Sequence, residues 1–129
     1  MSFDWTQFLD FAKALEACPD SPGPWEAALR SAVSRTYYAA FHHALDRAAN
    51  EGYVAKGTGE DHFSVREHFE KHRPNRVRAR IATELGRLYD HRIRADYRAR
   101  MGHRPDALAT DSVLLADLVI TLVGGLPTA

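Results

Sequence analysis

Apolar residues recur along most of this chain at intervals of three and four positions, the spacing that predicts amphipathic α-helices. The alternating runs and two-residue turns that mark β-strands are missing. Four stripes of this kind lie at 8–15, 25–48, 77–88 and 113–123. Connections rich in Pro, Gly and Ser separate them at 19–24, 52–61 and 102–106. We therefore expect an all-α protein, a four-to-five-helix up-and-down bundle.

Local signals suggest where these helices begin and end. Pro24 suits the first turn of the second helix, where its missing N–H has no cost. Ser64 and Glu67 have capping-box spacing, which predicts a short helix at Ser64–His72. The fourth helix should start just after Pro74-Asn75. Asp111 is expected to cap a last helix that ends at Gly124-Gly125.

Length and composition predict one globular domain over residues 1–129, with 45% hydrophobic and 26% charged residues. The N-terminus has no basic, secretory-type segment, and no uninterrupted apolar run reaches the roughly 18–20 residues that a membrane span needs. The single cysteine, Cys18, excludes an internal disulfide, lacks a cysteine partner for a metal site, and is expected to be a small packing residue. We expect a cytoplasmic location without a membrane.

Charge is distributed unevenly along the chain, although the formal net charge is zero. Residues 71–104 hold eleven basic residues and three acids, an excess of eight positive charges, whereas residues 105–129 hold three acids and no basic residue. A basic stretch of this kind can serve nucleic acid, and it can equally be a solvated helix face.

The clearest anomaly lies on the fourth helix. The stripe of Ile81, Leu85 and Leu88 continues into Arg92 and Asp96, so two charged residues occupy positions of core register. Burying a lone charge is costly, so each should be paired or border a cleft. Their i,i+4 spacing lets them meet. Two interpretations stay open: an internal ion pair that fixes helix packing, or a functional cleft or interface.

A polar stripe also runs beside the apolar one on the second helix. It contains Ser31, Arg35, Tyr38, His42 and Asp46. If this stripe faces the fourth helix, a shared polar seam would form. Its members would be Arg35, Tyr38, His42, Arg92, Asp96 and Tyr97. For His42, packing at a helix contact is the alternative to a catalytic role.

Two segments carry a resemblance to a known family. Arg30-Ser-Ala-Val-Ser-Arg-Thr-Tyr-Tyr-Ala-Ala-Phe-His-His-Ala44 resembles the signature second helix of HEPN-domain proteins, and Leu88-Tyr-Asp-His-Arg-Ile-Arg-Ala-Asp-Tyr97 is similar to their R-x-x-A-D-Y segment. The resemblance covers about residues 25–123. It implies a HEPN bundle that forms a homodimer, and it implies no cofactor. Many HEPN proteins are metal-independent ribonucleases, and several are toxins whose partner is a small nucleotidyltransferase.

The resemblance also implies site residues. HEPN ribonucleases carry an R-x4-6-H motif, in which the guanidinium stabilises phosphate charge and the imidazole transfers protons. Here Arg92 takes the Arg position and Tyr97 the His position. A tyrosine hydroxyl ordinarily has a pKa of about 10 and is a poor general base at neutral pH. Asp96 or His42 is the expected replacement. Other Arg and His pairs with motif spacing start at Arg98, Arg66 and Arg35. Random placement of these residues gives a similar number of matches, so the spacing alone identifies no site.

These observations predict a HEPN-type RNA-directed effector in a toxin–antitoxin or defence setting, either a ribonuclease or a degenerate version of one. Its tentative catalytic residues are Arg92, Asp96, Tyr97 and His42. Its expected RNA or nucleotide contacts are Arg35, Tyr38, Arg94 and Arg98. The alternative is a non-catalytic HEPN module that binds a nucleotidyltransferase partner or a nucleotide.

A third possibility is a metal-binding helical bundle. His68 and His72 are spaced i,i+4, and His62, His42 or His43 could add ligands. A two-His spacing is weak alone, and Glu67 and Glu70 lack the paired E-x-x-H arrangement of di-iron bundles. We therefore expect solvated histidines and no metal site.

Overall fold

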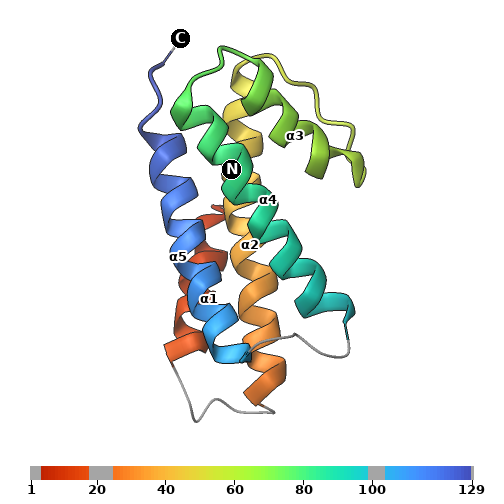
Figure 1. The fold of residues 1–129 in the computed structure, drawn as a ribbon, viewed down its shortest axis with the longest axis vertical. Helices are drawn as coiled ribbons and strands as arrows, with labels where there is room; N and C mark the ends of the chain where they lie inside the picture. The colour runs from red at the N-terminus through yellow and green to blue at the C-terminus, as the bar shows by residue number, and fades with distance from the viewer. Residues whose placement is uncertain (1–3, 18–24, 99–103, 129) are drawn as a thin grey trace.

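The structure, a computed structural model, describes residues 4–17, 25–98 and 104–128, and these contain five α-helices and no strand (Figure 1). The all-α prediction is therefore confirmed. The helices are α1 (Thr6–Ala17), α2 (Trp25–Asn50), α3 (Glu60–Lys71), α4 (Arg76–Tyr97) and α5 (Pro105–Gly124). Cys18 and Pro24 lie outside the described residues, as does His103, the histidine of the motif-spaced pair that starts at Arg98.

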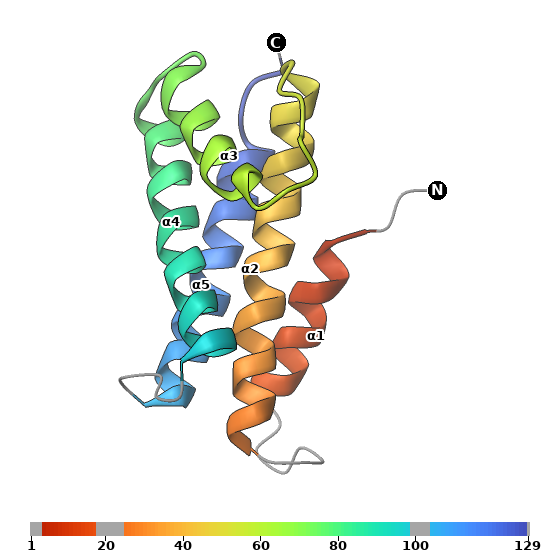
Figure 2. The same cartoon turned by 90° about the vertical axis from the view of Figure 1, so that its right-hand side faces the viewer.

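Helix α2 is the centre of the bundle and contacts each of the other four helices. Helices α2, α4 and α5 lie side by side along the long axis; α2 and α5 run in the same direction, and α4 runs in the opposite direction (Figure 1). Figure 2 shows α1 along one side of α2 and α3 near one end of α4. The C-terminal half of α4 therefore lies against the N-terminal half of α2, and this junction holds the predicted seam.

Small residues on α2 let its neighbours approach closely. Five alanines of this helix are buried: Ala32, Ala39, Ala40, Ala44 and Ala48. Larger side chains from α3 and α4 fill the space against them, including Phe69, Ile81, Leu85 and Leu88, each at most 1% exposed. The apolar stripes that the sequence predicted for α2 and α4 thus form the core.

Two residues of the predicted stripes are exposed. Val77 is 40% exposed, and the neighbouring Arg78 points inward instead, at 3% exposed. An arginine can occupy this position because Glu51 pairs with it. Phe11 is 52% exposed, whereas Leu9 and Ala12 of α1 are buried, at 5% and 0% exposed. The prediction for Val77 and Phe11 was wrong because helical period alone does not fix which edge of a stripe faces a neighbour.

Helix starts were predicted with mixed success. Helix α4 starts just after Asn75 as expected, and Asn75 caps it, since its side-chain oxygen accepts the backbone N–H of Arg78 at 2.9 Å. The capping box at Ser64 is wrong, because α3 begins four residues earlier, at Glu60. The cap at Asp111 is also wrong, because α5 begins at Pro105. Gly125 ends α5 as expected.

Helix α5 contains the most apolar long segment of the described chain. By length and composition alone, Asp106–Gly124 is long enough and apolar enough to cross a membrane. The prediction that no such segment exists was based on uninterrupted apolar runs, which Asp111 and Asp117 break within this helix. A helix that packs within a bundle has the same composition, and α5 packs against α2, α4 and α1.

Candidate functional site

Arg92 lies near the end of α4, on the face that meets α2. Its Nε donates to Oδ2 of Asp96 at 2.8 Å, which is the predicted i,i+4 pair. Its guanidinium carbon lies 5.2 Å from the centre of the Tyr38 ring and 5.4 Å from that of Tyr97. The Arg92 side chain is 12% exposed and that of Asp96 is 27% exposed. The ion pair therefore borders the surface and is not sealed in the core.

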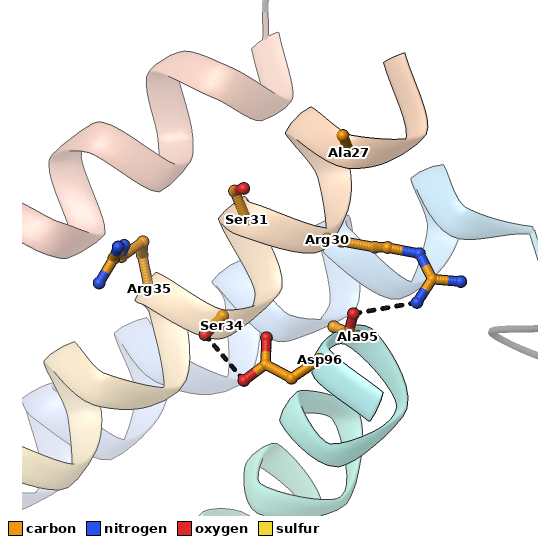
Figure 3. A pocket seen from close by; sticks show the side chains of 7 residues that line it. All are labelled: Ala27, Arg30, Ser31, Ser34, Arg35, Ala95 and Asp96. Carbon is orange, nitrogen blue, oxygen red and sulfur yellow. Dashed lines mark hydrogen bonds between the residues drawn. The ribbon is translucent and has the colours of Figure 1, made fainter. Parts of the chain in front are cut away.

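A hollow of about 330 Å³ opens beside Asp96, between α2 and the end of α4 (Figure 3). It is lined by Ala27, Arg30, Ser31, Ser34, Arg35, Ala95 and Asp96. The Ser34 hydroxyl donates to Oδ2 of Asp96 at 3.2 Å, so this carboxylate oxygen accepts hydrogen bonds from both helices. Hydroxyl, guanidinium and carboxylate groups thus surround a space that suits a small polar ligand.

Arg30 fixes the end of α4 against α2. Its Nη1 donates to the backbone carbonyl oxygens of Ala95 at 3.0 Å and Arg98 at 2.7 Å. Carbonyl groups at a helix C-terminus lack partners within the helix and carry partial negative charge, which a cation neutralises. Arg30 begins the first sequence motif, so this contact gives that motif residue a structural role. It positions the turn that holds Asp96.

The predicted seam is only partly assembled. Tyr38 faces Arg92, and Arg35 lines the same hollow as Asp96, with its guanidinium carbon 5.0 Å from the Phe8 ring centre. No contact of His42 with Arg92 or Asp96 is found among the described residues: its ring stacks on Trp5, with centroids 3.5 Å apart, and lies 6.2 Å from the Tyr38 ring. Burial lowers the pKa of His42. Ser34, which the sequence analysis did not select, takes the place beside Asp96.

The remaining predicted residues lie at the end of α4. Tyr97 is 69% exposed, and its hydroxyl is 3.4 Å from Nη2 of Arg92. Arg98 is exposed, whereas Arg94 is partly buried. The residue at the motif His position is thus a surface phenol that lies against the Arg92 guanidinium. The structure brings Arg92, Asp96, Tyr97 and Tyr38 together.

Sequence reasoning missed a second polar group on α3. The Nδ1 atom of His62 is 2.6 Å from the Tyr37 hydroxyl, which is buried in the core. Arg66, one turn later, has its guanidinium carbon 5.1 Å from the Tyr89 ring centre. Burial lowers the pKa of His62, and the positive charges of Arg92 and Arg66 add to the effect. The i,i+4 spacing of His62 and Arg66 was a usable signal, but the predicted start at Ser64 left His62 outside the helix.

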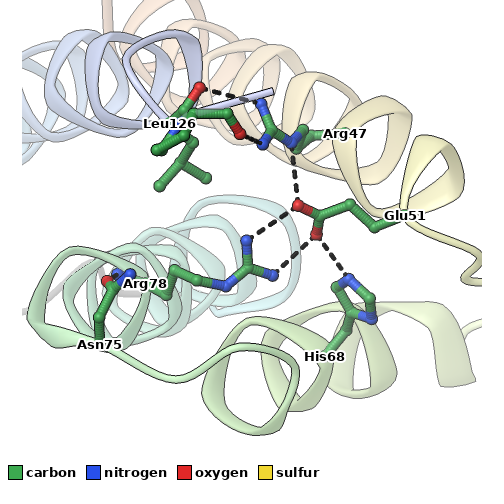
Figure 4. A network of polar contacts seen from close by, with 7 residues as sticks. Arg47, Glu51, His68, Asn75, Arg78 and Leu126 are labelled. Atoms are coloured by element: carbon green, nitrogen blue, oxygen red, sulfur yellow. Dashed lines mark hydrogen bonds and ion pairs between the residues drawn. The ribbon is translucent and has the colours of Figure 1, made fainter. Parts of the chain in front are cut away.

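Glu51 is the centre of a separate and more buried network at the other end of α2 (Figure 4). Its carboxylate accepts two hydrogen bonds from Arg78, at 2.8 and 3.0 Å, one from Arg47 at 3.0 Å and one from His68 at 2.9 Å. Arg47 also donates to the backbone carbonyls of Leu126 and Pro127. The Arg78 hydrogen bonds are the main reason that the pKa of Glu51 is far below its usual range.

This network also bears on the metal-binding possibility. Potential ligand atoms of Glu51, His68 and His72 lie within 4.8 Å of one another, whereas His62, His42 and His43 do not belong to this group. The Glu51 carboxylate already accepts hydrogen bonds from Arg47 and Arg78, so a metal cation there would face two guanidinium groups. The arrangement is suited to ion pairing between helices more than to metal binding.

No family model, curated protein or solved structure matches the chain. The resemblance to HEPN domains therefore stays a prediction carried by the two sequence motifs. What the structure adds is a five-helix bundle in which both motifs meet, because Arg30 of the first motif binds the backbone of the second and Tyr38 faces Arg92.

Proposed function

We propose that this protein is an RNA-directed effector of the HEPN type, in which Arg92 contacts the RNA phosphate. The observation that carries the proposal is the setting of Arg92. Its guanidinium is mostly buried between two tyrosine rings, yet it is held by a carboxylate that borders an open hollow. A fixed and permanently charged fork of this kind matches a phosphate group in shape and charge.

Cleavage of RNA through its own 2′-hydroxyl needs positive charge on the phosphate and an acceptor for the hydroxyl proton. Arg92 supplies the charge. Asp96 is the acceptor closest to it, and a phosphate that takes over the Arg92 guanidinium releases the Asp96 carboxylate for this role. The 2′-oxygen then attacks phosphorus, the bond to the 5′-oxygen breaks, and that oxygen takes a proton from solvent. A 2′,3′-cyclic phosphate and a 5′-hydroxyl end result.

The test is cleavage of total RNA by purified protein in the presence of EDTA. Wild-type protein should cleave without added metal, and Arg92→Ala should reduce the rate by about 100-fold or more, the loss typical of one charge-stabilising group. Arg80→Ala is a matched control, because Arg80 is an exposed arginine on the same helix. Equal rates for Arg92→Ala and wild-type protein would reject the role of Arg92.

The same proposal includes a homodimer, in which two copies bring their α4 ends into one cleft. Light scattering of the purified protein measures this directly. We expect wild-type protein to be a dimer and Tyr97→Asp to be a monomer, since Tyr97 is exposed at the end of α4, where the two copies would meet. A monomer at all concentrations would remove the shared cleft and leave a site built from one chain.

A second candidate is a non-catalytic module that binds a nucleotide or a nucleotidyltransferase partner. Two observations favour it: the Arg92 guanidinium already has Asp96 and the Tyr97 hydroxyl as hydrogen-bond partners, and position 97 has no imidazole. The two candidates differ in one result. The module would bind a nucleotide through Arg92 while total RNA stays intact, with and without magnesium.

A further inference from the structure

Arg66 on α3 is a partly buried cation without an acidic partner in the described parts of the chain. Its guanidinium lies against two aromatic rings, 5.1 Å from the Tyr89 ring centre and 6.0 Å from that of Phe63. Its Nη1 atom is buried and has no hydrogen-bond acceptor among the described residues. Cation–π contacts offset part of the cost of this arrangement, but they leave the N–H groups without acceptors. An anionic ligand would supply both the charge and the acceptor.

His62 lies one helical turn before Arg66 and presents a second donor. The Tyr37 hydroxyl is buried, and its described partner is Nδ1 of His62, at 2.6 Å. Burial raises the pKa of Tyr37, so this hydroxyl keeps its proton, and Nδ1 is the acceptor described for that proton when the imidazole proton is on Nε2. A neutral imidazole that accepts at Nδ1 carries its own proton at Nε2. In the tautomer that accepts from Tyr37, His62 is a hydrogen-bond donor at Nε2 even when it is uncharged.

A series of aromatic rings connects His62 and Arg66 to Arg92. The His62 ring lies 5.4 Å from the Tyr89 ring and 6.3 Å from the Tyr38 ring, and Tyr38 is the ring that Arg92 covers. A chain of ring contacts thus leads from Arg66 on α3 to Arg92 on α4. The outer ring beside Arg66 is Phe63, which is 61% exposed.

We propose that α3 provides a second phosphate-binding position, formed by Arg66 and His62, with Phe63 as a stacking surface for an unpaired base. This inference rests on the proposed function for the identity of the ligand, which is single-stranded RNA. Exposed aromatic rings beside cations are the arrangement by which proteins hold unpaired nucleotides, because the ring stacks on a base while the cation binds the backbone. Arg92 binds one phosphate, and the α3 pair binds a neighbouring one.

The test is fluorescence anisotropy of a labelled single-stranded RNA of about ten nucleotides, titrated with full-length protein at several salt concentrations. Arg66→Met keeps the side-chain stem against Tyr89 and removes the charge. It should weaken binding about tenfold and lower the slope of log K against log salt by about 0.7, the value for one phosphate contact on a single strand. Arg80→Met removes one exposed charge from α4 and should change affinity less than about twofold.

Substitutions of His62 test the donor separately from the ring. His62→Gln places an amide N–H near the Nε2 position and should retain wild-type affinity. His62→Phe keeps a ring and removes the donor, and it should weaken binding about fivefold or more. Thermal melting of each variant verifies that the bundle is folded.

The outcomes separate this inference from the function on which it rests. If Arg92→Ala weakens binding while Arg66→Met and His62→Phe behave like Arg80→Met, the α3 position is rejected and the role of Arg92 stands. If wild-type protein does not bind the RNA, both are rejected. Equal losses for Arg66→Met and Arg80→Met would also reject the α3 position, because they would show only non-specific attraction to a basic surface.

Discussion

Replacement of Glu51 by Gln should destabilise the bundle more than any single surface change. The Glu51 and Arg78 side chains are only 4% and 3% exposed, and their pairing joins the end of α2 to the start of α4. Through His68 and Arg47, the same carboxylate also holds α3 and the segment after α5 (Figure 4). The substitution removes the negative charge and leaves the Arg78 guanidinium buried without compensation.

The size of the effect follows from this burial. Removal of one partner from a buried ion pair costs about 3–5 kcal/mol, because the other charge stays desolvated. Gln keeps one oxygen as an acceptor, and Arg47 keeps the carbonyls of Leu126 and Pro127, so we expect the lower end, about 3 kcal/mol. A domain of this size typically has about 5–15 kcal/mol of stability in total. The melting temperature should fall by about 10 °C.

Urea denaturation followed by circular dichroism measures the free energy of unfolding, and Glu60→Gln is the matched control. Glu60 pairs with Lys56 in an exposed salt bridge, which is worth only about 0–1 kcal/mol. The double variant Glu51→Met/Arg78→Met should recover most of the loss, since it leaves no buried charge. If Glu51→Gln unfolds at the same urea concentration as Glu60→Gln, the argument from burial is refuted.

Three further results are expected. The difference in unfolding free energy between wild-type protein and Glu51→Gln should be constant near neutral pH and shrink below about pH 4.3. The reason is that the ion pairs of Glu51, which lower its pKa, stabilise the fold only while the carboxylate is ionised. A difference independent of pH would contradict this. Asn75→Ala should cost about 1 kcal/mol in the same denaturation assay through loss of the α4 cap, and no change would show that the cap is dispensable. Asp96→Asn should raise RNA affinity, measured by anisotropy, because it removes the carboxylate that competes with RNA for Arg92. The same substitution should lower the cleavage rate, because it removes the proton acceptor. Unchanged affinity would contradict the competition.

The sequence was most informative where local chemistry and helical period agreed. The apolar stripe of α2 and the start of α4 just after Asn75 were both predicted, since each depends on neighbours within a turn or two. The starts of α3 and α5 were misplaced for the opposite reason. Asp61 in the first turn of α3 accepts the backbone N–H groups of Lys56 and Gly57, so the preceding loop is organised by an acid already inside the helix. A capping-box pattern does not detect that arrangement.

The parts of the candidate site that depend only on α2 and α4 were predictable from the sequence, and the part that depends on α1 was not. Arg92 and Asp96 were identified because charge at core register is visible in the sequence, and their contact follows from their spacing. His42 was expected beside them because it shares a stripe with Tyr38. Its ring is 6.2 Å from the Tyr38 ring, but its closest ring contact is with Trp5, in a segment whose position depends on how α1 packs. The periodicity of α2 does not determine whether His42 contacts Trp5 or the Arg92–Asp96 pair.

The two charged networks of this bundle differ in how their charges are balanced, and that difference separates scaffold from site. At one end of α2, the Glu51 carboxylate accepts four hydrogen bonds from three side chains, so its negative charge is balanced within the chain, although Arg78 Nε is buried without an acceptor among the described residues. Near the end of α4, Arg92 has one carboxylate at the edge of a hollow, and Arg66 has no acid among the described residues. Burial of incompletely compensated positive charge lowers stability, so its retention beside exposed aromatic rings is best explained by a ligand that completes it. In the proposed function, RNA phosphate would supply the acceptor that Arg66 Nη1 lacks and would compete with Asp96 for Arg92.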